Sequence, residues 1–119
     1  MDTKNYTFPR DARLLNPRDF SFVFEKAIPA VSPTLTVLAR FNDKNCARLG
    51  ITVAKKKVKH AVQRNRIKRC VRDSFRLNAH KLPNVDIIVV AKHGIGSMDN
   101  ASIHQQINKL WERLIKRCQ

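Results

Sequence analysis

The sequence contains one long stretch that is rich in cations and free of acids. Between Asp43 and Asp73 there is no Asp or Glu, whereas eleven of the chain's 24 Lys and Arg residues fall there. Guanidinium groups bind phosphate oxygens through paired hydrogen bonds, and lysine ammonium groups act as point charges. A solvated helix normally interleaves Glu with Lys, which lowers repulsion. The stretch therefore predicts a surface that binds a polyanion.

The densest part of this stretch fits one long amphipathic helix that ends near His80. Its apolar side should enter the core, because five residues gather there at 100° per residue. They are Ile67, Cys70, Val71, Ser74 and Phe75. The opposite side carries Asn65, Lys68, Arg69, Arg72 and Arg76. The triplet Arg64-Asn65-Arg66 spreads around the helix, so it can contact several phosphate groups at once.

Hydrophobic periodicity predicts the elements that position this helix. A short helix begins at Asn16-Pro17 and is closed by Pro29 and Pro33. Alternating residues predict strands at 35–41 and 49–53, which the turn at 42–47 would join as a hairpin. The continuous apolar run 85–91 predicts a buried strand, and a capped helix follows from residue 99 or 100. The fold class is α+β, with a small sheet backed by helices and, by the general preference, a right-handed crossover.

Length and composition favour one domain over residues 1–119, with residues 1–15 as an extended arm. The net charge of +15 accompanies 43% hydrophobic residues, too many for a disordered polycation. The longest apolar run is far below the roughly 20 residues of a membrane span, and the amino terminus does not resemble a secretory signal. Three widely spaced cysteines predict neither a disulfide framework nor a zinc site. We expect a cytoplasmic protein that does not bind membranes.

No pattern of catalytic residues is visible. The nine acids never pair closely, and the four histidines are too far apart for a local ligand pair. The sequence contains no phosphate-binding GxxxxGK[ST] loop, no nucleophile elbow and no HExxH motif. We therefore expect no catalytic residue, no metal site and no bound cofactor in this chain.

Phe20 and Phe24 on the first helix have two interpretations. Their helical spacing is typical of core residues, but aromatic side chains also stack on unpaired bases. The outward strand positions leave one face of the sheet partly polar, and a short helix beside that face would leave a groove suited to single-stranded RNA. These positions are Thr36, Leu38, Arg40 and Thr52.

Three segments, in this order, resemble the bacterial ribonuclease P protein subunit. They are Phe8-Pro9-Arg10 with Arg13-Leu14, the Gly-Ile-Thr-Val-Ala-Lys-Lys run at 50–56, and the Arg-Asn-Arg-Ile-Lys-Arg run at 64–69. The strand at 85–91 and the final helix with Trp111 also match, so the resemblance covers nearly the whole chain.

The resemblance implies a protein subunit of an endoribonuclease whose chemistry is carried by RNA. The large RNA subunit would remove the 5′ leader of precursor tRNA by phosphodiester hydrolysis and would require Mg²⁺. The partners would be that RNA and precursor tRNA, with no obligate protein partner. The implied fold has about four mainly antiparallel strands, three helices and a left-handed β-helix-β crossover, contrary to the general preference.

The resemblance also implies two sets of contact residues. Contacts with the RNA subunit are expected for Lys55, Lys57, Arg64, Asn65, Arg66, Lys68, Arg69 and Arg72. Contacts with the leader are expected for Arg10, Arg13, Phe20, Phe24, Leu38, Thr52 and Lys56. Leu38 stands where a stacking aromatic residue would be expected.

Composition alone leaves other functions open. A ribosomal or ribosome-assembly protein would also be small and basic, and copurifying RNA would separate it from the first interpretation. A self-sufficient nuclease would cleave precursor tRNA in the absence of an RNA subunit. A DNA-binding protein is a further alternative, although no helix-turn-helix spacing is visible.

Overall fold

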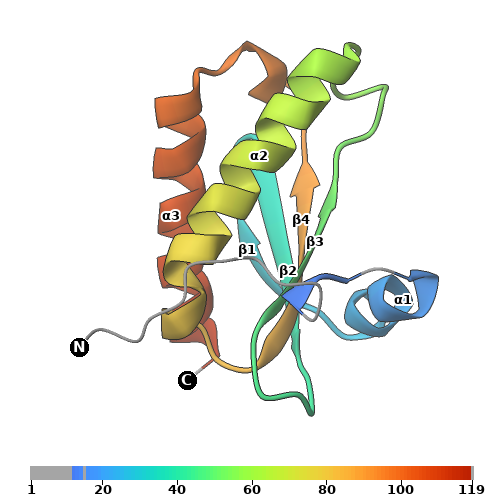
Figure 1. The fold of residues 1–119 in the computed structure, drawn as a ribbon, viewed down its shortest axis with the longest axis vertical. Coiled ribbons are helices and arrows are strands. Elements are labelled where there is room, and N and C mark those ends of the chain that lie inside the picture. The colour runs from blue at the N-terminus through green and yellow to red at the C-terminus, as the bar shows by residue number, and fades with distance from the viewer. Residues whose placement is uncertain (1–11, 15, 119) are drawn as a thin grey trace.

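The computed structural model describes residues 12–14 and 16–118 and contains a four-stranded sheet with helices on both faces (Figure 1). The helices are α1 (Pro17–Glu25), α2 (Ala61–Asn78) and α3 (Asn100–Arg117), and single 3₁₀ turns at Ala79–Lys81 and Ile95–Ser97 flank β4. The strands are β1 (Ile28–Val31), β2 (Leu35–Phe41), β3 (Arg48–Thr52) and β4 (Val85–Ala91). This confirms the predicted α+β class.

The strand order is β1-β2-β4-β3. β1 pairs antiparallel with β2, β2 pairs antiparallel with β4, and β3 pairs parallel with β4. The predicted hairpin between β2 and β3 is therefore wrong, because β4 lies between them. β4 is buried almost throughout, as the continuous apolar run predicted, since helices cover both faces of this central strand.

Pro29 does not close α1, which ends at Glu25. Instead it lies in β1, a strand that the sequence analysis did not place, and pairs in register with Leu38 of β2. β1 is an edge strand, where a residue without a backbone N–H is tolerated because one side of the strand needs no ladder partner.

The connection from β3 through α2 to β4 is a left-handed crossover. In Figure 1, α2 crosses in front of the sheet, β3 and β4 point the same way, and β4 lies to the left of β3. This agrees with the family resemblance and departs from the general right-handed preference.

α1 and α3 begin at side-chain caps that the sequence predicts, and α2 buries the face that the sequence predicts. The Asn16 side chain accepts a 3.1 Å hydrogen bond from the backbone N–H of Asp19, and Asp99 accepts one of 2.7 Å from that of Ser102. The five residues expected on the apolar side of α2 are its five buried residues. α2 and α3 cover one face of the sheet, whereas α1 packs on the other through a small cluster around Val23 and Ile88.

A hydrogen-bonded triad of the buried Trp111 and Ser74 with the exposed Asn108 fixes α2 against α3. The indole N–H of Trp111 donates to Ser74 Oγ at 2.9 Å, and that hydroxyl donates to Asn108 Oδ1 at 2.6 Å. Because Ser74 is on the apolar side of α2, this contact sets which face of the helix remains outward.

Candidate RNA interface

The outward face of α2 carries cations without carboxylate partners. Arg69 and Arg72 are exposed and Lys68 is half-buried. Within residues 12–14 and 16–118, none of these three side chains forms a hydrogen bond or ion pair. Asn65 is also exposed. Farther along the helix, Arg76 lies 3.6 Å from Asp73. The predicted face therefore presents uncompensated charge over its middle turns.

Arg64 holds the lysine-rich loop that precedes α2. Its Nη1 donates to the carbonyl oxygens of Lys59 at 2.8 Å and Val58 at 3.1 Å. Val58 is buried and anchors the same loop in the core. Lys55 and Lys56 remain exposed, and Lys57 is half-buried. The loop thus places cations beside the start of α2.

Arg66 joins α2 to the connection between β4 and α3. Its Nε donates to Gln63 Oε1 at 2.8 Å, Nη1 to Asn100 Oδ1 at 2.7 Å and Nη2 to the Gly96 carbonyl at 3.2 Å. All three acceptors are neutral, so they orient the guanidinium without cancelling its charge.

A groove lies between α1 and the end of β3. It encloses about 570 Å³ and is lined by Asn16, Pro17, Phe20, Ser21, Phe24 and Thr52. Phe24 is 53% exposed, which shows that its helical spacing did not indicate a core position. Three of the predicted leader contacts, Phe20, Phe24 and Thr52, therefore come together.

A smaller hollow of about 150 Å³ connects this groove with α2. Its lining includes Arg13, Phe20 and Gly50 together with Lys68 and Arg72 of α2. Phe20 borders both hollows, so the aromatic groove and the cationic helix face are neighbouring parts of one surface. The backbone of residues 13 and 14 runs along β3, and Leu14 N donates to the Leu49 carbonyl at 2.9 Å.

Of the other predicted leader contacts, Leu38 and Lys56 line neither hollow. Leu38 is half-buried and packs with Val23 and Ile88 beneath α1. Lys56 is exposed in the loop after β3. Arg10, and most of the predicted extended arm, lie outside the described residues.

An ion-pair network around the buried Asp86 carboxylate was not predicted from the sequence. Arg48 donates to Asp86 through Nε–Oδ1 at 2.7 Å and Nη2–Oδ2 at 2.6 Å, and its Nη2 lies 3.6 Å from Asp19 Oδ1. The hydrogen bond to Asp86 raises the pKa of Arg48. Asn42 donates to the same carboxylate at 2.8 Å. A single acid inside the apolar run 85–91 was the signal that a cation must reach it.

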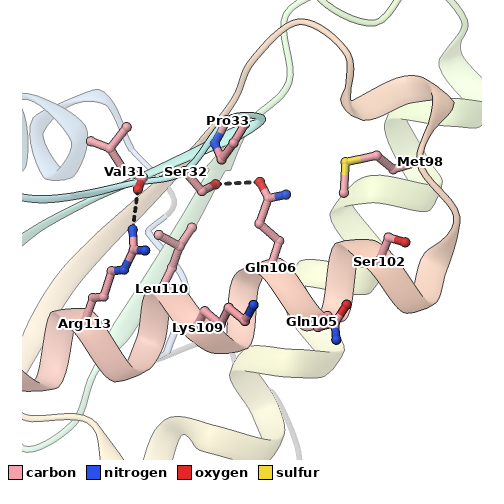
Figure 2. Close-up of a pocket in the computed structure, with 10 residues that line it drawn as sticks. All are labelled: Val31, Ser32, Pro33, Met98, Ser102, Gln105, Gln106, Lys109, Leu110 and Arg113. Atoms are coloured by element: carbon pink, nitrogen blue, oxygen red, sulfur yellow. Dashed lines mark hydrogen bonds between the residues drawn. The ribbon is translucent and has the colours of Figure 1, made fainter.

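Another hollow lies away from the predicted site, between α3 and the turn from β1 to β2 (Figure 2). It encloses about 330 Å³. Ser32 and Thr34 both donate to Gln106 Oε1 at 2.5 Å, and Arg113 donates to the Val31 carbonyl at 2.7 Å. These polar groups join α3 to the sheet, and none belongs to the predicted RNA contacts.

Three further observations concern features other than the cationic face and the groove. In the part of the chain that the structure describes, no three His, Cys, Asp or Glu side chains come together as a metal-binding group. No helix of that part is long and apolar enough to cross a membrane. Burial raises the pKa of the Cys70 thiol, so this cysteine is a packing residue of α2.

An uncompensated cationic helix beside an aromatic-lined groove, on a small basic α+β domain, defines an RNA-binding protein. The family model described as Ribonuclease P matches residues 8–115. The chain belongs to this family, the protein component of an endoribonuclease that processes the 5′ end of tRNA.

Curated relatives and solved structures agree with this assignment. The ribonuclease P protein component of Pseudoalteromonas atlantica is 56% identical over 95% of this chain and 94% of its own length. That of Pasteurella multocida is 53% identical over 94% of each chain. The Staphylococcus aureus RNase P protein superposes with a TM-score of 0.80 at 27% identity, covering 87% of this chain and 97% of its own. The Thermotoga maritima RNase P protein gives 0.75 at 31% identity, covering 85% and 96%.

Proposed function

We propose that the outward face of α2 binds the RNA subunit of ribonuclease P, and that the groove beside α1 binds the 5′ leader of precursor tRNA. The observation that carries this proposal is the pair of hollows that share Phe20. Through them the unpaired cations Lys68 and Arg72 adjoin an aromatic-lined groove. An RNA chain leaving a structured region can therefore enter the groove without losing contact with protein.

The two parts of this surface act differently on the reaction. The cations of α2 and of the loop before it lower the repulsion between RNA phosphates, which strengthens assembly in a salt-dependent way. The groove contacts a single strand that mature tRNA lacks, so it favours substrate over product. Base stacking on an exposed ring such as Phe24 contributes roughly 1 to 3 kcal/mol per base in other single-strand complexes.

Two of the predicted contacts have a double role in this proposal. Arg64 and Arg66 remain charged and lie at the same end of α2, but they also hold the adjoining loops. Their effect on RNA affinity is then partly through the position of neighbouring cations. Lys68, Arg69 and Arg72 have no such internal role and act by direct contact.

A charge-matched pair of triple variants tests the α2 surface. Replacing Lys68, Arg69 and Arg72 by Met should lower the slope of log affinity for the RNA subunit against log salt by roughly 2 to 3, because each lost phosphate contact removes about 0.7 to 0.9. The control replaces three exposed cations of α3 with the same loss of charge. They are Lys109, Lys116 and Arg117.

The control separates a specific surface from net charge. We expect its salt slope to stay within about 1 unit of the unmodified protein, because distant charges are screened over about 10 Å at 0.1 M salt. If both triple variants show the same decrease in affinity for the RNA subunit and in the slope of log affinity against log salt, α2 is not the binding surface. Thermal unfolding of each variant checks that the domain remains folded.

We also propose that Mg²⁺ acts on the RNA subunit and that this chain supplies no catalytic residue. The chain's described contribution at the interface consists of cations and aromatic side chains, which bind phosphates and bases rather than metal ions. RNA-free protein with Mg²⁺ should leave a 5′-labelled precursor tRNA intact, whereas the reconstituted holoenzyme should release the leader. Specific cleavage by RNA-free protein would support the self-sufficient nuclease instead.

A further inference from the structure

The groove depends on a helix that has little apolar anchorage of its own. α1 has nine residues, and isolated helices shorter than about 12 residues are marginal in water. Val23 is its one fully buried side chain. Phe20 and Phe24 project from the same helix and line the groove. Any shift of α1 therefore changes the width of the groove.

Arg40 of β2 holds the carboxyl-terminal end of α1. Its Nη1 donates to the Phe22 carbonyl at 2.7 Å and lies 3.3 Å from Glu25 Oε2. The guanidinium also lies 3.9 Å from the centroid of the Phe22 ring. The last carbonyls of a helix have no partner within the helix and attract cations. Arg40 therefore makes three interactions with this end of α1: a hydrogen bond to a carbonyl, a favourable interaction with the helix dipole and a cation–π contact with the Phe22 ring.

Arg48 of β3 reaches the other end of the same helix. Its Nη2 lies 3.6 Å from Asp19, in the first turn of α1. Two hydrogen bonds to the buried Asp86 of β4 fix the guanidinium on the sheet. The position of Arg48 is therefore fixed by the sheet, and its ion pair with Asp19 holds the start of α1 against β3.

These two arginines differ in their charge partners from Lys68, Arg69 and Arg72 on the outward face of α2. Arg40 is paired with Glu25, and Arg48 is paired with Asp86 and Asp19. A guanidinium that already has a carboxylate partner gains less from a phosphate, because that partner must first be displaced or shared. Both side chains lie under or beside α1, and neither lines the 570 Å³ groove.

We propose that Arg40 and Arg48 are positioning residues for the leader: they hold the two ends of α1 on the sheet so that Phe20 and Phe24 face the groove. They act through α1 and do not touch the leader. This inference rests on the proposed leader-binding function of the groove. It assigns substrate discrimination to two sheet residues that carry no exposed contact surface there.

The test uses holoenzyme reconstituted with the RNA subunit and compares precursor tRNA with mature tRNA. The ratio of the dissociation constant of mature tRNA to that of precursor tRNA, measured before cleavage proceeds, isolates the contribution of the leader. Weaker binding of the leader lowers this ratio. Arg40→Met should weaken precursor binding roughly threefold to tenfold and leave mature tRNA binding within about twofold, as expected for the loss of a half-buried charge-assisted hydrogen bond. Asp19→Asn, which weakens the longer 3.6 Å ion pair with Arg48, should weaken precursor binding by about twofold.

Three further variants make the result specific. Arg113→Met removes the same charge and a carbonyl hydrogen bond of the same 2.7 Å length, but on α3, and should leave the ratio unchanged. Arg40→Lys keeps the positive charge and a hydrogen-bond donor, so its ratio should lie between those of Arg40→Met and the unmodified protein. The same variant replaces Arg40→Met in the test if Arg40→Met does not fold. Phe24→Ala reports directly on the groove and should reduce the ratio by itself.

Each outcome decides the proposal. A selective loss for the precursor with Arg40→Met but not Arg113→Met supports it. An equal loss for precursor and mature tRNA overturns it, because Arg40 then acts on overall folding. An unchanged ratio in Arg40→Met alongside a reduced ratio in Phe24→Ala overturns the positioning role but leaves the leader groove intact. An unchanged ratio in both variants overturns the groove and the inference together.

Discussion

Replacement of Gly50 by Ala should disturb the groove through a steric clash that the structure locates. A β-carbon at this position would lie 2.7 Å from Cζ and 2.8 Å from Cε1 of Phe20, and 3.2 Å from Cβ of Leu14. Real β-carbons essentially never approach a side chain within 3.0 Å, so the Phe20 ring has to move. The ring borders both hollows, and α1 moves with it if the ring does not rotate.

The expected cost is that of overpacking a closely packed contact. Extra methyl groups in such positions typically destabilise by about 1 to 3 kcal/mol. We expect a value near the lower end, about 1 kcal/mol, because the clashing atoms belong to the edge of a half-buried ring and not to the backbone. The same displacement should reduce the ratio of mature tRNA to precursor dissociation constants, since Phe20 lines the groove.

Urea unfolding of four proteins measures this clash directly. They are the unmodified chain, Gly50→Ala, Phe20→Leu and the double variant. Leu lacks the outer ring atoms, so Gly50→Ala should cost less in the Phe20→Leu background by about 1 kcal/mol. Additivity within about 0.5 kcal/mol would refute the reasoning, because the two positions would then not be in steric conflict.

A second glycine provides the matched control. A β-carbon at Gly96 would meet Val58 at 3.5 and 3.9 Å, which is ordinary van der Waals contact. Gly96→Ala should therefore change the unfolding free energy by no more than about 0.5 kcal/mol and leave the leader ratio unaltered. A cost equal to that of Gly50→Ala would show that loss of glycine, rather than the contact with Phe20, is responsible.

Three further predictions concern charged side chains. Asp86→Ala should lower the unfolding free energy by roughly 3 kcal/mol in urea, because Arg48 would keep a largely buried charge without its bidentate partner. Arg66→Met should destabilise by about 1 to 2 kcal/mol in the same assay, because it breaks two hydrogen bonds from α2 to Asn100 and Gly96 and one within α2. Hydrogen bonds from Ser102 lower the pKa of Asp99, so its contribution to stability is present above the usual aspartate pKa and is lost as pH falls through the lower folded value. The unfolding free energy of Asp99→Asn should lack that part of the acid dependence.

Exposed residues of the same type serve as controls for these variants. Asp43→Ala removes a carboxylate that is 93% exposed and should hardly change the unfolding free energy. If Asp43→Ala and Asp86→Ala lower the unfolding free energy equally, the buried ion pair is not the cause. Arg69→Met should be as stable as the unmodified chain while lowering the RNA salt slope. If Arg66→Met is equally stable, its hydrogen bonds do not hold the β4–α3 connection. If Asp99→Asn follows the same acid profile as the unmodified chain, another group is responsible.

Helix faces could be predicted from the sequence because a period of 3.6 residues needs no knowledge of partners. The buried residues of α2 were all identified in this way. The same periodicity could not show whether an aromatic residue at the margin faces core or solvent. Val23 is fully buried while Phe24, its neighbour in the same pattern, is 53% exposed, because α1 contacts the sheet along a narrow strip.

Strand pairing could not be predicted, because the sheet is assembled by chain crossings that leave no local pattern. β2 and β3 are consecutive in the sequence, and consecutive strands usually pair. Here residues 42–47 carry the chain past the position that β4 fills later. β1 was missed for a different reason. A proline such as Pro29 is typical of a helix end, and it is compatible with a strand here because β1 lies at the edge of the sheet.

The acid-free stretch predicted the cationic surface correctly in outline but could not distinguish its members. Counting charges along the sequence does not separate Arg48 from Arg69, since the nearest acid is five positions from Arg48 (Asp43) and four from Arg69 (Asp73). The fold brings Asp86 from β4 and Asp19 from α1 to Arg48, whereas Arg69 receives no partner from the described residues. A protein with 24 cations and nine acids cannot neutralise them all. Where its few carboxylates lie therefore separates the arginines that we propose position α1 from the cations that we propose bind RNA.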